Sequence, residues 1–160
     1  RNCYPISKLM CESLCCAYES EYRVPAKIIR LTQTLGAEVN ENDTRIFAYF
    51  AKCVEEKQDI ILRTTGETER CYLFATDAVT AILSVMLKGK DGEAYNAADE
   101  KTYCSISKMA EKAAMDGGIK VKYEIQDEAS NGYPKALHIN LDTSKLKNLG
   151  WKPGNNIGIG

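Results

Sequence analysis

A helix-length segment leads directly into a short strand-like run, and this order restricts the fold more than any other feature of the chain. Residues 4–22 carry apolar side chains at helical spacing, among them Leu14, Ala17 and Tyr18. Residues 27–31 (KIIRL) are rich in β-branched side chains, which is the composition of a short buried strand. A helix followed at once by such a strand is the second half of a βαβ unit. We therefore expect an α/β protein built on a parallel sheet.

The remainder of the chain alternates helical and extended patterns. We expect further helices that begin near the possible caps at 42–44, at Thr76, at Ser105 and at Asp142 or Thr143. Gly117 and Gly118 should end the third of these helices. Strands are expected at 60–62, 70–74, 94–97, 119–125 and 137–141, with a polar loop at 126–135.

Composition excludes several classes of function. The chain has 160 residues, a formal net charge of −1 and 44% hydrophobic residues, which is enough for one core. Its basic residues are scattered, so neither nucleic acid nor an anionic membrane surface is an expected partner. No apolar run approaches the roughly 20 residues of a membrane-spanning helix, and the start has no signal-peptide layout. The missing initiator Met is compatible with the chain being the back part of a longer polypeptide.

The cysteines do not predict a metal site. Seven cysteines are irregularly spaced, and the single histidine, His138, lies far along the chain. Zinc sites use closely spaced Cys pairs or Cys with nearby His, and neither arrangement occurs. We expect reduced, mostly buried thiols in a cytoplasmic protein, and no bound metal.

Tyr4, Lys8 and Glu12 recur at intervals of four residues. On a helix this spacing places the phenol, the ammonium group and the carboxylate along one face. A nearby cation favours a phenolate, so the Tyr4 pKa is expected to fall from about 10 towards neutrality, where a phenol acts as a general acid/base. The competing interpretation is that Tyr4 and Lys8 are two surface side chains of an amphipathic helix.

The chain resembles the C-terminal half of the NAD-dependent nucleotide-sugar epimerases and dehydratases, which are extended short-chain dehydrogenases/reductases. The resemblance runs from Tyr4 to about Pro153 and rests on five motifs in the family's order. These are Tyr4-x-x-x-Lys8 with Glu12, residues 30–36 (RLTQTLG), residues 70–77 (RCYLFATD), residues 92–96 (GEAYN) and residues 142–151 (DTSKLKNLGW).

The resemblance implies roles for five residues. Tyr4 would be the acid/base at a sugar hydroxyl, and Lys8 would hold the nicotinamide ribose and lower the Tyr4 pKa. The backbone around Leu31 would meet the nicotinamide carboxamide. Gln33 would contact the sugar or its phosphate, and Arg70 would bind the nucleotide diphosphate, a role that suits a guanidinium fork. Epimerisation, dehydration and decarboxylation are all compatible with these motifs, as are NAD and NADP.

The sequence departs from the family pattern at the substrate contacts. Gln33 replaces the usual Asn, Leu35 the usual Tyr, and Ala37 a frequent Pro. The chain also contains no G-x-x-G-x-x-G loop to hold a pyrophosphate. We therefore expect the isolated chain to bind NAD weakly or not at all and to be inactive. A redox-silent relative that binds a nucleotide or a partner protein is the alternative function.

The resemblance also implies a domain organisation. Residues 1–35 would form the catalytic helix and the following strand of a Rossmann-like sheet whose N-terminal dinucleotide-binding half is absent. Residues 36–153 would form mainly the smaller substrate-binding lobe, with a return strand near 94–97, and residues 154–160 a flexible tail. The full-length parent would bind a nucleotide sugar and form a homodimer.

Several side chains also have purely structural interpretations. Arg70 could pair with a neighbouring glutamate, and Asn96 should hydrogen-bond a nearby loop. His138 should be a strand residue with one bonded nitrogen. Trp151 should pack the last helix onto the body with its indole N–H bonded, and Glu12 should be an ion-pair partner near Lys8.

Overall fold

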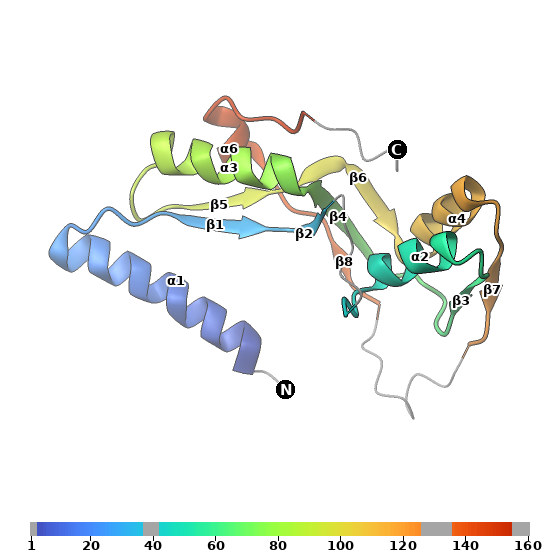
Figure 1. The fold of residues 1–160 in the computed structure, drawn as a ribbon. Helices are drawn as coiled ribbons and strands as arrows, with labels where there is room; N and C mark the ends of the chain where they lie inside the picture. The colour runs from blue at the N-terminus through green and yellow to red at the C-terminus, as the bar shows by residue number, and fades with distance from the viewer. Residues whose placement is uncertain (1–2, 37–41, 126–135, 155–160) are drawn as a thin grey trace.

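The computed structural model describes residues 3–36, 42–125 and 136–154, which form an α/β fold (Figure 1). The elements are α1 Cys3–Tyr22, β1 Ile28–Leu31, β2 Gln33–Leu35, α2 Ile46–Glu55, β3 Ile60–Leu62, β4 Glu69–Phe74, α3 Ala75–Lys88, β5 Ala94–Ala97, β6 Asp99–Ser105, α4 Ile106–Gly117, β7 Val121–Tyr123, β8 His138–Ile139 and α6 Ser144–Asn148. Among these residues, no helix has both the length and the apolar character that a bilayer crossing requires.

Strands β1 and β5, which are far apart in the sequence, form a small parallel sheet. β1 pairs with β5, in register from Ile28 opposite Ala94 to Leu31 opposite Ala97. In Figure 1, α3 and α6 lie on one side of this sheet and α1 on the other. Buried residues of α3, β5 and the C-terminal segment form one core with Leu73 of β4: Leu73, Ala78, Ala81, Val85, Tyr95, Ala97, Leu146 and Trp151. The expected parallel pairing of the strands near Ile28 and Tyr95 is confirmed.

The segment after α6 is fastened to α3. The Trp151 indole is buried, and its Nε1 donates to Thr80 Oγ1 at 3.0 Å, so the expected role of Trp151 is confirmed. The Gly154 amide donates to Asp77 Oδ1 at 3.0 Å. Residues 155–160 of the expected tail lie outside the described residues.

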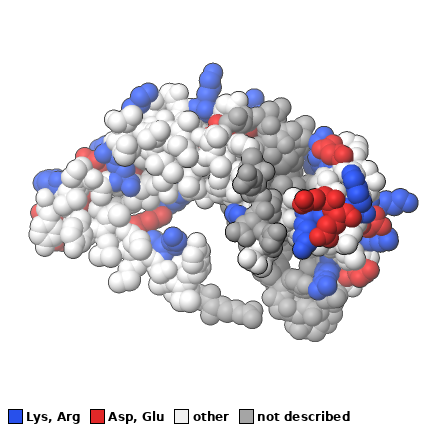
Figure 2. Space-filling model, in the orientation of Figure 1, with Lys and Arg blue, Asp and Glu red and all other residues white. Residues whose placement is uncertain are grey.

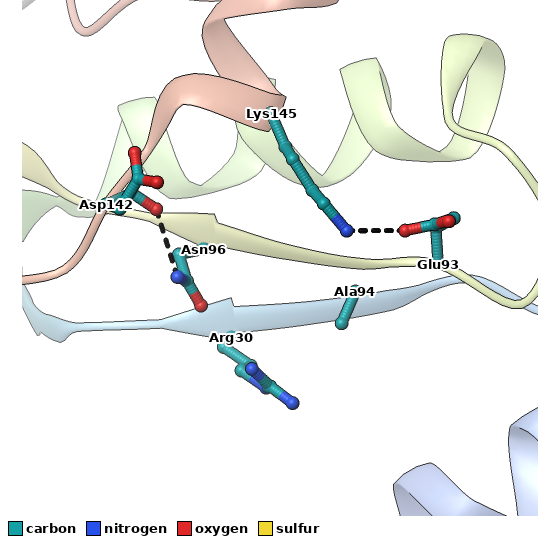
Figure 3. Close-up of a pocket in the computed structure, with 6 residues that line it drawn as sticks. All are labelled: Arg30, Glu93, Ala94, Asn96, Asp142 and Lys145. Atoms are coloured by element: carbon teal, nitrogen blue, oxygen red, sulfur yellow. Dashed lines mark hydrogen bonds and ion pairs between the residues drawn. The ribbon is translucent and has the colours of Figure 1, made fainter.

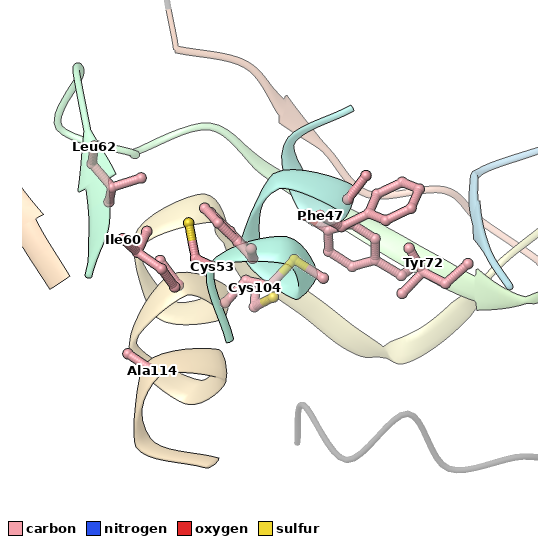
Figure 4. Packing of buried hydrophobic residues seen from close by; sticks show 12 residues of the cluster. Phe47, Cys53, Ile60, Leu62, Tyr72, Cys104 and Ala114 are labelled. Atoms are coloured by element: carbon pink, nitrogen blue, oxygen red, sulfur yellow. The ribbon is translucent and has the colours of Figure 1, made fainter. Parts of the chain in front are cut away.

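Strands β2, β4, β6 and β8 form a second, mixed sheet, which we call the lobe sheet. Its strand order is β2-β4-β6, with β8 beside β4. β2 and β8 run parallel to β4, and β6 runs antiparallel to it. Helices α2 and α4 contact each other and pack on this sheet, while β3 and β7 form a parallel pair nearby. Figure 4 shows the resulting core, which consists of Leu35, Phe47, Ala48, Phe50, Cys53, Ile60, Leu62, Tyr72, Cys104, Met109, Ala110 and Ala114.

Two strands are absent from the sequence prediction, and two are shorter than predicted. β2 is missed because it has only three residues, and β6 because it begins with the polar run Asp99-Glu100-Lys101. Inside β6, the Thr102 hydroxyl accepts from the Tyr72 amide at 2.7 Å and donates to the Tyr72 carbonyl at 3.1 Å. This side chain satisfies the backbone where the β4–β6 register shifts. β7 and β8 occupy only part of the expected 119–125 and 137–141.

The helix starts are partly as predicted. Ser105 caps α4 by accepting from the Lys108 amide at 3.1 Å, and Gly118 ends that helix at φ +66°, which glycine adopts without strain. The expected caps of two other helices are wrong. α2 begins after Arg45 and α3 after Phe74, neither with a side-chain cap, so Thr76 lies inside the first turn of α3.

Helix α1 has the expected extent, but it buries no residue. Its cysteines therefore differ from the expectation of mostly buried thiols: Cys3, Cys11 and Cys16 are exposed and Cys15 is half-buried. The buried thiols are those of the sheets and α2: Cys53, Cys71 and Cys104. All seven cysteines are free. In the described parts of the chain, no group of three or more potential ligands is arranged to hold a metal ion.

Candidate active site

Tyr4 and Lys8 lie on the same side of α1, one turn apart. The Lys8 Nζ is 5.6 Å from the centre of the Tyr4 ring, which is the range of a cation–π contact. Tyr4 is 69% exposed, so its hydroxyl is accessible. The described atoms at the amino-terminal end of α1 border an open hollow on the face shown in Figure 2. An accessible phenol beside a cation is the arrangement that an acid/base tyrosine needs.

The partner of Glu12 is Arg30 on β1. Arg30 donates from Nε to Glu12 Oε1 at 2.8 Å and from Nη2 to Glu12 Oε2 at 2.5 Å. These hydrogen bonds lower the pKa of the Glu12 carboxyl and raise the pKa of the Arg30 guanidinium. The expected structural role of Glu12 as an ion-pair partner is therefore confirmed, and its partner is Arg30 on the sheet.

Gln33 and Arg70 are brought together by the lobe sheet. Gln33 on β2 lies opposite Tyr72 on β4, and Arg70 is two residues before Tyr72. Gln33 therefore faces Tyr72 across the β2–β4 pair, while the β4–β6 register shifts between Arg70 and Tyr72. Within the described ranges, Gln33 Oε1, Arg70 Nε and the Tyr72 hydroxyl are buried and meet no hydrogen-bond partner. Burial raises the Tyr72 pKa to about 12, so this phenol is neutral.

Tyr72 was missed by the sequence analysis. No signal along the sequence identifies it, because only the β2–β4 register places Tyr72 opposite Gln33. Buried polar atoms without partners are rare in folded proteins, because each costs about 1–3 kcal/mol. Gln33 Oε1, Arg70 Nε and the Tyr72 hydroxyl are such atoms, and Tyr72 itself is fully buried in the core with residues of α2 and α4.

Arg70 does not pair with the neighbouring Glu69. The Glu69 Oε2 atom lies 2.7 Å from His138 Nδ1 and accepts from the Tyr103 hydroxyl at 2.9 Å. Both contacts lower the pKa of the Glu69 carboxyl. The expectation of one bonded nitrogen on His138 is confirmed. Within the described residues, the Arg70 Nε meets no hydrogen-bond partner.

Leu31 ends β1, and its side chain is 42% exposed. The amide of the next residue, Thr32, donates to the Ala97 carbonyl at 3.1 Å, and Gln33 then begins β2. The chain therefore passes from the β1–β5 sheet to the lobe sheet within two residues. The structure joins Tyr4 with Lys8 on α1 and Gln33 with Arg70 in the lobe, and the segment through Leu31 connects the sheets.

A cavity of about 390 Å³ lies elsewhere, along β1 and β5. Figure 3 shows its lining residues: Arg30, Glu93, Ala94, Asn96, Asp142 and Lys145. Lys145 pairs with Glu93 at 2.5 Å, and Asn96 Nδ2 donates to the Asp142 carbonyl at 3.0 Å, which confirms the loop contact expected of Asn96. Arg30 is held by Glu12 and Lys145 by Glu93, so the two cations of this cavity are already paired.

Comparisons with known proteins identify the family and the fold. A family model described as "NAD dependent epimerase/dehydratase family" matches residues 1–98. The dTDP-D-glucose 4,6-dehydratase of Bos taurus is 26% identical over 161 residues, covering 95% of this chain and 43% of the relative. UDP-glucuronic acid decarboxylase 1 of Xenopus tropicalis is 24% identical over 155 residues, covering 96% of this chain and 35% of that relative.

Solved structures show the same fold. UDP-glucose 4-epimerase of Thermotoga maritima, determined with UDP-glucose, has a TM-score of 0.82 at 21% identity, covering 96% of this chain and 49% of that one. A dTDP-glucose 4,6-dehydratase of Bacillus anthracis in complex with NAD has a TM-score of 0.79 at 21% identity, covering 97% and 48%. The chain thus spans about half the length of these proteins, and less than half of the two curated relatives.

Proposed function

This chain belongs to the NAD-dependent epimerase/dehydratase family, and we propose that it is the catalytic-tyrosine and substrate-binding portion of a nucleotide-sugar epimerase or dehydratase. The observation that carries the proposal is the accessible Tyr4 phenol with Lys8 beside it on the same helix face. Similar proteins that act on dTDP-glucose and UDP-glucuronic acid support the substrate class.

In this proposal Tyr4 moves the proton of the reaction. Its phenolate takes the proton from a sugar hydroxyl as the carbon that bears the hydroxyl is oxidised, and its phenol returns a proton when the carbonyl is reduced. NAD, when bound, supplies the hydride acceptor for this chemistry. Lys8 would donate to the nicotinamide ribose hydroxyls, and the backbone at Leu31 would meet the carboxamide.

The residues present suit only one end of the dinucleotide. Tyr4 and Lys8 provide a cation and a phenol for the nicotinamide ribose, whereas the sequence has no glycine-rich loop for the pyrophosphate. We therefore propose that the isolated chain binds NAD weakly or not at all, and that the remaining part of a longer polypeptide supplies the cradle. A homodimer and a cytoplasmic location are further parts of this proposal.

The lobe face is the proposed nucleotide-sugar site. Arg70 would bind the diphosphate, since a guanidinium fork matches phosphate oxygens in charge and geometry. Gln33 would accept a hydrogen bond from the sugar or contact its phosphate. The unpartnered Gln33 Oε1 and Arg70 Nε atoms support this assignment.

The test is Tyr4→Phe in the full-length polypeptide. Turnover of a nucleotide sugar should fall by about 100-fold or more while NAD affinity is retained, because only proton transfer is removed. Tyr22→Phe is the matched control, since Tyr22 lies on the same helix and is 68% exposed against 69% for Tyr4. Unchanged activity in the Tyr4→Phe protein would support a redox-silent binding protein instead.

A further inference from the structure

Lys8 has two possible partners on its own helix. Tyr4 is four residues before it and Glu12 four residues after it, and both positions are neighbours of Lys8 on the helix surface. The structure shows Lys8 over the Tyr4 ring, with no carboxylate partner for it in the described part of the chain. Glu12 would compete for Lys8 if its carboxylate were free.

Arg30 removes that competitor. Its fork occupies both oxygens of Glu12, at 2.8 and 2.5 Å. The two acidic residues that line the same cavity as Arg30 are held elsewhere: Glu93 pairs with Lys145 (Figure 3), and Asp142 Oδ1 accepts from the Ser144 amide at 2.8 Å. The guanidinium is therefore directed to Glu12.

We propose that Arg30 is a positioning residue that withdraws the Glu12 carboxylate from Lys8 and so keeps the Lys8 ammonium beside Tyr4. The importance of this placement for catalysis rests on the proposed function. The electrostatic arrangement itself is a property of this chain and can be measured without substrate or cofactor.

The alternative interpretation is that the Glu12–Arg30 ion pair only holds α1 against β1, and it predicts a different result. α1 buries no residue, so the Glu12–Arg30 fork also fastens the helix to the sheet. If fastening were its whole role, Glu12→Gln, Arg30→Gln and the double variant would affect Lys8 equally. If Arg30 withdraws Glu12, only Arg30→Gln releases a carboxylate that can capture Lys8, and adding Glu12→Gln reverses the effect.

The experiment measures the acetylation rate of Lys8 in the 160-residue chain by peptide mass spectrometry. An ammonium group paired with a carboxylate holds its proton more tightly, so less free amine is present to react. We expect Arg30→Gln to slow Lys8 acetylation by a factor of about 1.5 to 2 at low ionic strength, as for a helical pair of this spacing. The difference should shrink at high salt because the pair is exposed. Glu12→Gln and the double variant should not show the slowing.

The chain contains its own calibration. Lys52 on α2 and Glu56 just after it form an ion pair with the same spacing and order, at 3.7 Å, so the Lys52 rate with and without Glu56→Gln measures what such a pair does to acetylation. The exposed Lys101 serves as the reference within each sample. Circular dichroism checks that each variant is folded. Wild-type rates in Arg30→Gln, or equal slowing in Arg30→Gln and the double variant, would overturn the inference. Because no catalysis is measured, either result stands apart from the outcome of Tyr4→Phe.

Discussion

Tyr72→Phe should make the isolated chain more stable. The Tyr72 side chain is fully buried in the lobe core, and its hydroxyl has no partner in the described residues. Burying a hydroxyl without a hydrogen bond costs about 1–3 kcal/mol, whereas phenylalanine keeps the ring packing. We expect the free energy of unfolding to rise by about 1 kcal/mol, measured by urea denaturation at neutral pH with an unchanged slope.

Tyr95→Phe is the matched control. Tyr95 is also buried, but its hydroxyl accepts from the Lys90 amide at 2.8 Å. Its removal leaves that amide without its partner, so this variant should lose about 1 kcal/mol. The two tyrosines should therefore differ in the sign of the change, although both substitutions delete one oxygen atom.

Alkaline pH provides a second test of the Tyr72 environment. Burial raises the folded-state pKa to about 12, whereas an unfolded tyrosine titrates near 10. The neutral phenol therefore contributes stability below about pH 10, and this contribution declines as the pH rises towards the folded pKa. The advantage of Tyr72→Phe should widen above about pH 10. Destabilisation by Tyr72→Phe at neutral pH, as large as that of Tyr95→Phe, would refute the reasoning that the hydroxyl lacks a partner.

The remaining predictions concern the same lobe and α1. Arg70→Lys should weaken nucleotide-sugar binding by the full-length polypeptide about tenfold or more in calorimetry, because a lysine cannot replace the two-pronged contact with a diphosphate; unchanged affinity would remove Arg70 from the site. Hydrogen bonds from His138 and Tyr103 lower the Glu69 pKa, so the stability that they provide is present above the ordinary carboxyl pKa and is lost as the pH falls through the lower folded value. Glu69→Gln should make the free energy of unfolding depend less on pH in the acid range, as measured by denaturation. An unchanged pH dependence would contradict the stabilising role of the Glu69 hydrogen bonds. Alkylation of the native chain should modify the exposed thiols and spare the buried ones, with mass spectrometry separating two sets: Cys3, Cys11 and Cys16 against Cys53, Cys71 and Cys104.

Local patterns were sufficient where an element has a strong period or a clear end signal. The helix at 4–22 and the strand at 94–97 follow from apolar spacing, and the Ser105 cap and the Gly118 stop follow from local hydrogen bonding and backbone conformation. β6 could not be found in this way. Its opening residues are polar, and it is stabilised by pairing with β4, a contact that depends on residues about 30 positions away.

In the candidate site, too, relations within one element could be predicted and relations between elements could not. Helical spacing correctly places Tyr4 and Lys8 on one face, because both belong to a single element. The partner of Glu12 was not predicted because Arg30 lies 18 residues away on a strand, and spacing along the helix carries no information about it. Tyr72 becomes visible as a site residue only when the β2–β4 register is known.

The most direct test of the account mixes the full-length polypeptide, loaded with NAD, with nucleotide sugars of the dTDP-glucose, UDP-glucose and UDP-glucuronic acid types. The near-ultraviolet absorbance of reduced nicotinamide is then followed during a single turnover. We predict that the wild-type protein shows a rise in this absorbance with at least one of these sugars, and that Tyr4→Phe slows the rise by about 100-fold or more while Tyr22→Phe does not. An equally fast rise in the Tyr4→Phe protein, or no reduction of NAD by the wild type with any of these sugars, would contradict the assignment of Tyr4 as the acid/base.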